Sequence, residues 1–151
     1  MIARLTRIAL LLLLTSVVSC SVDEGDPEQQ VRAWVSAMQE AAGEKDRKAI
    51  VANISPAYVD ARGHSRDDID KLLRLYFLRQ NNIVLLGRID DVRIIGETAA
   101  EVSVTLGMAA TNNSAPGLSA DAYRFELELE YDGDDWKLIS ARWGQLGDQV
   151  H

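Results

Sequence analysis

The hydrophobic period of this 151-residue sequence changes once, near Asn82. Before that point, apolar side chains recur every three or four residues, as they do on one face of a helix. After it, they alternate with polar side chains, as they do in strands that bury one face. Helices followed by strands predict an α+β domain, in which N-terminal helices pack on the apolar face of an antiparallel sheet.

Three helices are expected before Asn82, and each has a start signal. Asp26 and Pro27 open the first, with Gln29 as a capping-box partner, and Gly43 ends it. Asp46 caps a short second helix over 47–54. Ser65, with Asp68 three residues later, caps a third helix over 66–80. The apolar face of that third helix comprises Ile69, Leu72, Leu73, Tyr76 and Phe77.

Four strands are expected after Asn82, and their order predicts an antiparallel meander. The first spans 83–95, with a bulge or bend near Gly87 or Asp90-Asp91. The alternating residues of the next two lie within 102–108 and 123–131, separated by a loop over 111–118. The last strand spans 135–143 and follows the hairpin signal Asp132-Gly133. A brief additional strand over 57–61 is possible between the helices.

The N-terminus has the order of a secretory signal peptide. Arg4 and Arg7 precede an apolar run over 8–18, which small residues follow. The run is too short to cross a bilayer, which takes about 20 apolar residues. We therefore expect residues 1–19 to be a removed signal peptide, 20–25 to be a short tether and 26–147 to be the folded domain.

The end of that segment, Val17-Val18-Ser19-Cys20, resembles the bacterial lipobox at all four positions. The resemblance implies cleavage before Cys20 and attachment of diacylglycerol to its sulfur, with a further fatty acid such as palmitate on its amino group. Ser21, where Asp would favour retention in the inner membrane, implies the periplasmic face of the outer membrane. An ordinary secreted protein is the alternative. Cys20 is the only cysteine, so an acylated chain would have no thiol for disulfides or metals.

The charge of the chain excludes one class of partner. The formal net charge is −7 at pH 7, and removal of Arg4 and Arg7 makes it more negative. Such a surface repels nucleic acid and anionic lipid. We therefore expect no nucleic-acid binding, and attachment to the membrane through the lipid alone.

The order of elements over 26–143 resembles the nuclear transport factor 2-like, or cystatin-like, superfamily. Two segments are typical of its small bacterial members: Ser55-Pro-Ala-Tyr-Val-Asp60 and the closing Asp132-Gly-Asp-Asp-Trp-Lys-Leu-Ile139. The resemblance implies a strongly bent sheet wrapped on the third helix around a conical cavity. Its members range from isomerases and polyketide cyclases to inert binding domains, so the fold alone does not select an activity.

Five residues are candidates for a site in that cavity. Asp60 would be the base of an isomerase-type enzyme, with Tyr76 or Tyr58 stabilising an enolate. The simpler interpretation is that Asp60 caps a turn and that Tyr76 is core. Tyr123 and Trp143 are candidates for the pocket wall, with core packing as the alternative.

The other polar residues give weaker indications. His64 could move protons, but a solvated loop residue explains it more simply. His64 and His151 are too few for a zinc site, and we expect no metal and no cofactor. Charges at alternate positions of one strand would repel a second copy across the open sheet face, so we expect a monomer; they are Arg124, Glu126, Glu128 and Glu130.

Two functions follow from these observations. The first is a lipid-anchored, non-enzymatic domain that binds a small apolar molecule, a lipid or an envelope protein. The alternative is a cavity enzyme of the isomerase or cyclase type that uses Asp60 as base. Asp60 beside a tyrosine in an apolar pocket would favour the enzyme. A cavity filled by Trp34, Phe77 and Trp143 would leave only a protein-interaction role.

Overall fold

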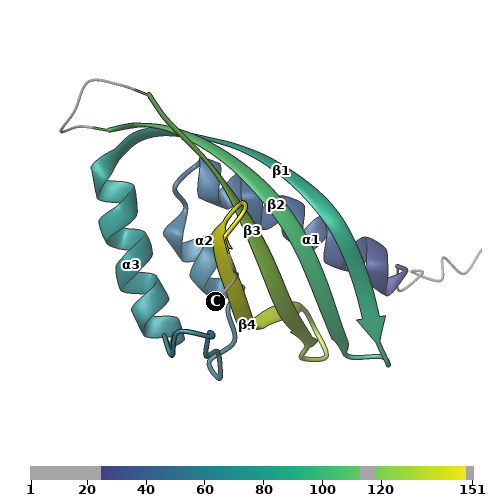
Figure 1. Ribbon diagram of the computed structural model, residues 1–151. Helices are drawn as coiled ribbons and strands as arrows, with labels where there is room; N and C mark the ends of the chain where they lie inside the picture. Colours follow the sequence, from purple (N-terminus) through teal and green to yellow (C-terminus); the bar gives the residue numbers. More distant parts are fainter. Residues whose placement is uncertain (1–24, 113–117, 149–151) are drawn as a thin grey trace, which may run out of the picture.

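The computed structural model describes residues 25–112 and 118–148 (Figure 1). Cys20, the expected signal peptide over 1–19, the tether up to residue 24 and the centre of the expected loop over 111–118 lie outside the described residues. None of the described helices is long and apolar enough to cross a membrane.

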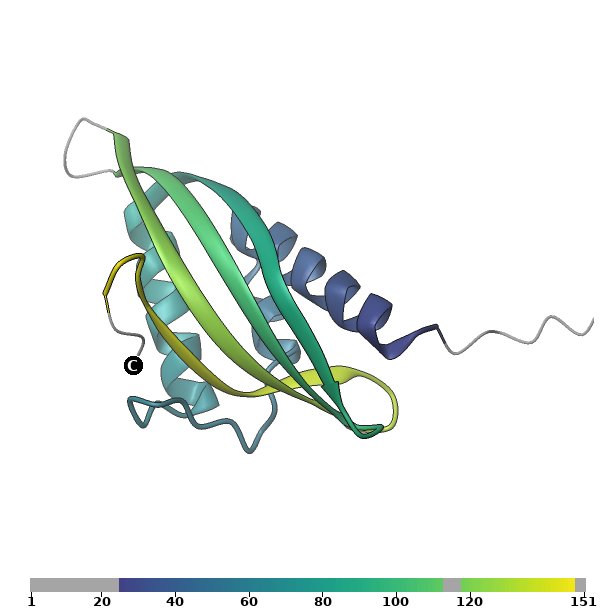
Figure 2. The ribbon, with the colours of Figure 1, turned by 45° about the vertical axis from the view of Figure 1, so that its right-hand side comes forward.

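The predicted α+β class is confirmed. Three helices come first: α1 (Pro27–Gly43), α2 (Arg47–Ala52) and α3 (Arg66–Arg79). Four strands follow and pair in sequence order as an antiparallel sheet: β1 (Gln80–Ile95), β2 (Ala99–Asn112), β3 (Leu118–Tyr131) and β4 (Trp136–Gln145). The sheet is strongly curved, and all three helices lie on its concave side (Figures 1 and 2).

Three irregularities interrupt the strand pairing: one at Asn81, at the start of β1, and two further along the strands. Asp90 is an extra residue in β1, because Ile89 pairs with Val104 while Asp91 pairs with Ser103. Ile139 is an extra residue in β4, because Leu138 and Ser140 pair with consecutive residues of β3. A bulge bends its strand and changes which side chains face inward. Apolar residues on both sides of Asp90 therefore reach the same core; they are Ile89, Val92 and Ile94.

The segment before α3 covers the free edge of β4. The backbone N–H groups of Ser55, Val59 and Ala61 donate to carbonyls of β4 at 2.9–3.2 Å. The brief strand expected over 57–61 is nevertheless wrong, since only isolated bridges form there. Pro56 has no N–H to donate, and Tyr58 donates to the carbonyl of Ser55 in a turn instead. The irregular segment thus protects an edge that another chain could otherwise pair with.

Helix α1 packs closely against β1. A Cβ on Gly87 would overlap the side chain of Gln39, whose Nε2 donates to the carbonyl of Leu85 at 3.2 Å. The amide end of the Gln39 side chain therefore lies directly over Gly87. At the other end of α1, Trp136 Nε1 donates to Gln30 Oε1 at 3.0 Å, which attaches the helix to the start of β4.

The expected ends of α1 at Asp26 and Gly43 are confirmed, but the expected capping box is wrong. Asp26 caps its start by accepting from the N–H of Glu28 at 3.3 Å, but Gln29 is not a capping-box partner. Gly43 is the last helical residue, and the left-handed residue that ends the helix is Lys45, with φ of 58°. The Lys45 ammonium donates to the carbonyls of Gln80 and Asn81, so a contact with β1 holds this residue in place.

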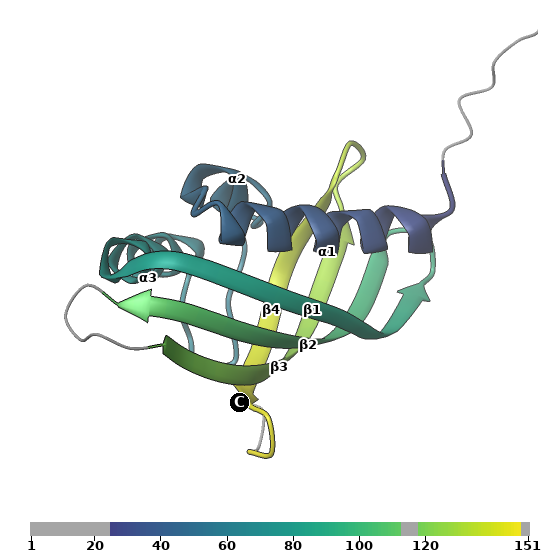
Figure 3. The same ribbon diagram turned by 90° about the horizontal axis from the view of Figure 1, so that it is seen from above.

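Helix α3 has the predicted start and an unexpected lack of burial. Ser65 and Asp68 form a capping box, and the hydrogen bonds from Ser65 lower the pKa of Asp68 from 3.8 to about 2. No residue of α3 is fully buried, although Ile69, Leu73 and Phe77 pack partly on the core. Figure 3 shows α3 at the end of the sheet where β1 begins, away from the strand centres.

We expect Ser65→Ala to lower the free energy of unfolding by about 1 kcal/mol, because the N–H of Asp68 loses its acceptor. Urea denaturation followed by far-ultraviolet circular dichroism measures the change. Ser36→Ala is the matched control: Ser36 lies inside α1 and donates only to its own helix, so alanine there should be neutral or slightly stabilising. Equal effects of the two changes would contradict the capping role.

Candidate functional site

An apolar cavity of about 550 Å³ lies between the helices and the concave face of the sheet. All three helices and all four strands contribute to its wall, as does Tyr58 of the segment before α3. Six aromatic side chains line it among aliphatic ones: Trp34, Tyr58, Tyr76, Tyr123, Phe125 and Trp143. The cavity is therefore not filled by Trp34, Phe77 and Trp143; two of these form part of its wall, and Phe77 is not among the lining residues.

No described residue that lines the cavity carries a charge. The polar groups of the lining residues are the amide of Gln39, the tyrosine hydroxyls and the indole N–H groups. The Nε1 atom of Trp34 is buried and has no hydrogen-bond partner in the described part of the chain. Buried N–H groups are nearly always paired, so this donor is an exception, and its lack of accessible surface places it inside the wall rather than on the surface of the cavity.

Tyr76 points its hydroxyl across the cavity. The group donates to the sulfur of Met108 on β2 at 2.9 Å, so it connects α3 to the sheet. Burial raises the pKa of Tyr76, and the neighbouring Tyr123 and Asp121 raise it further. Tyr76 and Tyr123 thus lie close together on opposite walls. With its pKa raised, the hydroxyl of Tyr76 stays neutral near pH 7.

Tyr58 forms part of the floor of the cavity. Its side chain is 2% exposed, and its pKa is raised mainly by burial and secondarily by the negative charge of Asp60. The neighbouring carboxylate therefore opposes ionisation of the hydroxyl. Tyr58 can offer a hydrogen bond to a bound molecule, but it is a poor acid.

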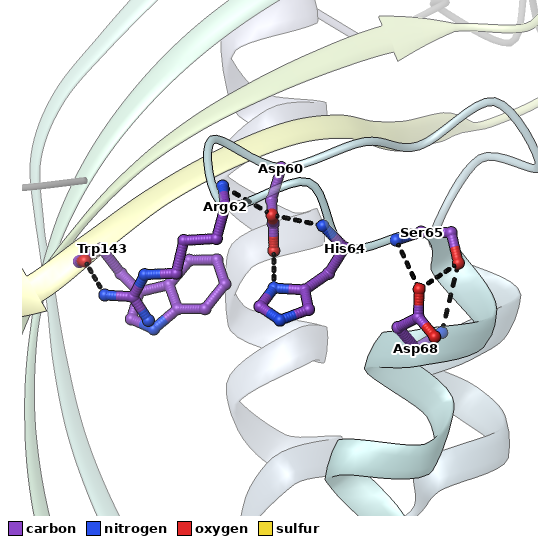
Figure 4. Close-up of polar contacts among 6 residues, drawn as sticks. All are labelled: Asp60, Arg62, His64, Ser65, Asp68 and Trp143. Atoms are coloured by element: carbon purple, nitrogen blue, oxygen red, sulfur yellow. Dashed lines mark hydrogen bonds and ion pairs between the residues drawn. The ribbon is translucent and has the colours of Figure 1, made fainter.

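Asp60 does not line the cavity. Its Oδ1 accepts from the backbone N–H groups of Arg62 and His64 at 2.8 Å each, and its Oδ2 lies 2.9 Å from Nδ1 of His64 (Figure 4). The side chain is completely buried. All of these contacts are within one loop, so Asp60 holds the turn that leads into α3. His64 is correspondingly more than a solvated loop residue, because the carboxylate fixes its ring.

Trp143 brings the sheet and this loop together. Its ring stacks on Phe125 with centroids 6.4 Å apart, and the guanidinium carbon of Arg62 lies 4.5 Å from the centre of the same ring. Arg62 also donates to the carbonyl of Trp143 at 3.0 Å. The indole is therefore a wall of the cavity on which an exposed cation rests.

Sequence reasoning named four of the lining residues and missed others. Tyr58, Tyr76, Tyr123 and Trp143 share the cavity, whereas Asp60 lies behind the wall in its loop. Arg62 is not among the candidate site residues predicted from the sequence. The available signal is its place between Asp60 and Gly63, in a predicted turn before a helix. Among the described residues, no three His, Cys, Asp or Glu side chains lie close enough to hold a metal ion.

Comparison with solved structures identifies the fold. A ketosteroid isomerase-like protein from Erwinia carotovora atroseptica superposes with a TM-score of 0.70 at 14% identity, covering 82% of this chain and 99% of that one. A nuclear transport factor 2-like superfamily protein from Salmonella enterica gives 0.67 at 12%, covering 81% and 92%. An uncharacterised protein with a cystatin-like fold from Caulobacter vibrioides gives 0.64 at 16%, covering 79% and 89%.

No family model matches the chain, and no curated protein matches it. At these identities the superpositions concern the fold, and an activity has to be argued from the site itself. The chain has the nuclear transport factor 2-like α+β cone fold.

We expect Asp60→Ala to lower the free energy of unfolding by about 2 kcal/mol, because the N–H groups of Arg62 and His64 lose their acceptor. Asp60→Asn should cost less than half as much, since its amide oxygen can still accept from both. Urea denaturation of the two variants provides the comparison. If neither variant is less stable than the original chain, Asp60 does not hold the turn.

Proposed function

We propose that this protein binds a small, largely apolar molecule in the cone cavity without transforming it. The observation that carries the proposal is the uncharged, aromatic-rich wall around about 550 Å³. This volume falls within the ~300–1,000 Å³ typical of ligand pockets, which are mostly apolar with a few polar groups. The hydroxyls of the lining tyrosines are the polar groups that would orient the molecule.

The site gives little support to the alternative, an isomerase or cyclase that uses Asp60. A general base must come within hydrogen-bond reach of the proton that it removes. Asp60 does not reach the cavity wall, and its oxygens already accept from its own loop. Tyr58 and Tyr76 have raised pKa values, so neither offers a readily ionised group in its place.

The place of action that we propose is the periplasmic face of the outer membrane. The support is the lipobox-like Val17-Val18-Ser19-Cys20 after an apolar segment, and Ser21 after it. A diacylglycerol and an amide-linked acyl chain together would anchor the domain stably. With a tether of only a few residues, the cavity would remain close to the bilayer, where apolar molecules concentrate.

Binding in the cavity is tested with N-phenyl-1-naphthylamine, an uncharged apolar dye that fluoresces when it leaves water. The unlipidated domain should bind it with saturable fluorescence. Leu106→Trp should weaken binding at least tenfold, because Leu106 lines the cavity and an indole there would occupy its space.

Leu86→Trp is the matched control. Leu86 is 76% exposed, and in β1 it lies next to the inward-facing Leu85, on the opposite face of the sheet. The same substitution there adds an indole outside the cavity, so dye binding should not change. Absence of dye binding, or equal loss in both variants, would refute binding in the cavity.

Lipid attachment is tested in a Gram-negative host grown with radioactive palmitate. The full chain should be labelled and should fractionate with the outer membrane, and Cys20→Ala should lose the label. Ser21→Asp should keep the label and move to the inner membrane. An unlabelled full chain would mean that the protein is secreted without a lipid.

A further inference from the structure

Arg62 does not line the cavity, but its side chain lies against a residue that does. Its guanidinium lies over one face of the Trp143 ring, and that ring is part of the cavity wall. Arg62 is exposed and Trp143 is partly exposed, so the indole that lines the cavity also reaches solvent beside this cation. Figure 4 shows Arg62 and His64 projecting from the same loop toward the same side, beside the indole.

The charge of Arg62 has no carboxylate partner among the described residues. Its one side-chain hydrogen bond goes to the carbonyl of Trp143, a neutral acceptor. Asp60 is the nearest acid in sequence, but its side chain contacts the ring of His64 and not the guanidinium of Arg62. Arg32, Arg47, Arg88 and Arg93 pair with acids, whereas the other described arginines, like Arg62, form no ion pair; what sets Arg62 apart is its contact with an aromatic residue of the cavity wall.

This unpaired cation lies in an acidic protein with a net charge of −7. The aromatic face and the carbonyl of Trp143 fix the guanidinium plane, which reduces the entropy that binding would cost. A guanidinium has five N–H donors, and one fixed bond leaves an edge that can hold both oxygens of a carboxylate.

We propose that the molecule bound in the cavity is an amphipathic monocarboxylate, with its apolar chain inside and its carboxylate on Arg62. This inference rests on the proposed binding function and adds the class of ligand. The uncharged wall accepts the chain but offers no counterion for a head group. The head group therefore has to remain at the rim, where Arg62 supplies one positive charge for one negative charge.

The experiment compares decanoate with 1-decanol, which have the same chain length, in displacing N-phenyl-1-naphthylamine from the unlipidated domain. We expect Arg62→Met to weaken decanoate binding about tenfold, as the loss of a hydrogen-bonded charge pair would, and decanol binding less than twofold. Methionine keeps an apolar stem over Trp143. Arg62→Lys, which keeps the charge without the planar fork, should recover part of the decanoate affinity.

Arg142→Met is the matched control, because Arg142 precedes Trp143 on β4 and faces the other side of the sheet beside Glu126. It removes the same charge and should leave both affinities unchanged. Two results would overturn recognition of the carboxylate by Arg62. One is an equal loss of affinity for decanoate and for decanol in Arg62→Met, and the other is a loss of decanoate affinity in Arg142→Met as large as that in Arg62→Met. If the dye binds but neither compound displaces it, the ligand class is wrong; if the dye itself does not bind, the proposed function fails first.

Discussion

The extra residues Asp90 in β1 and Ile139 in β4 are the constraint on which the rest of the structure depends. Each bulge bends its strand while apolar side chains on both sides continue to face the helices. A sheet bent in this way cannot be covered by one straight helix along its whole length. The Gln39 side chain of helix α1 lies over Gly87 of β1, and the remaining concavity is the cavity.

The bulge in β1 was predictable and the one in β4 was not recognised. In β1 the inward apolar positions change from odd to even numbers across Asp90, and two adjacent aspartates mark the place. In β4 the change from Trp136 and Leu138 to Ala141 and Trp143 carries the same signal. Ile139 hides it, because an apolar residue in the bulge makes the strand look continuous.

Local sequence signals predict the start of α3 well. Features that depend on contacts between residues far apart in the sequence cannot be predicted in this way. Ser65 and Asp68 lie three residues apart, so their capping box can be read directly. The contact of Arg62 with Trp143 joins residues 81 positions apart, and nothing in the period of either segment indicates it. Asp60 was ambiguous between turn and base for the same reason: a carboxylate near an aromatic segment does not show which way it faces.

The way α3 is held explains why a cavity remains between this helix and the sheet. The helix begins in a capping box and continues without a loop into β1. Its sides are attached by polar contacts: Arg47 pairs with Asp70, and Arg66 donates to the carbonyl of Val51. These contacts fix the helix at its ends and along α2, so its central apolar residues do not have to pack tightly against the sheet. Tyr76 spans the remaining space to Met108, and the apolar surface left on either side of that contact is what a ligand would cover.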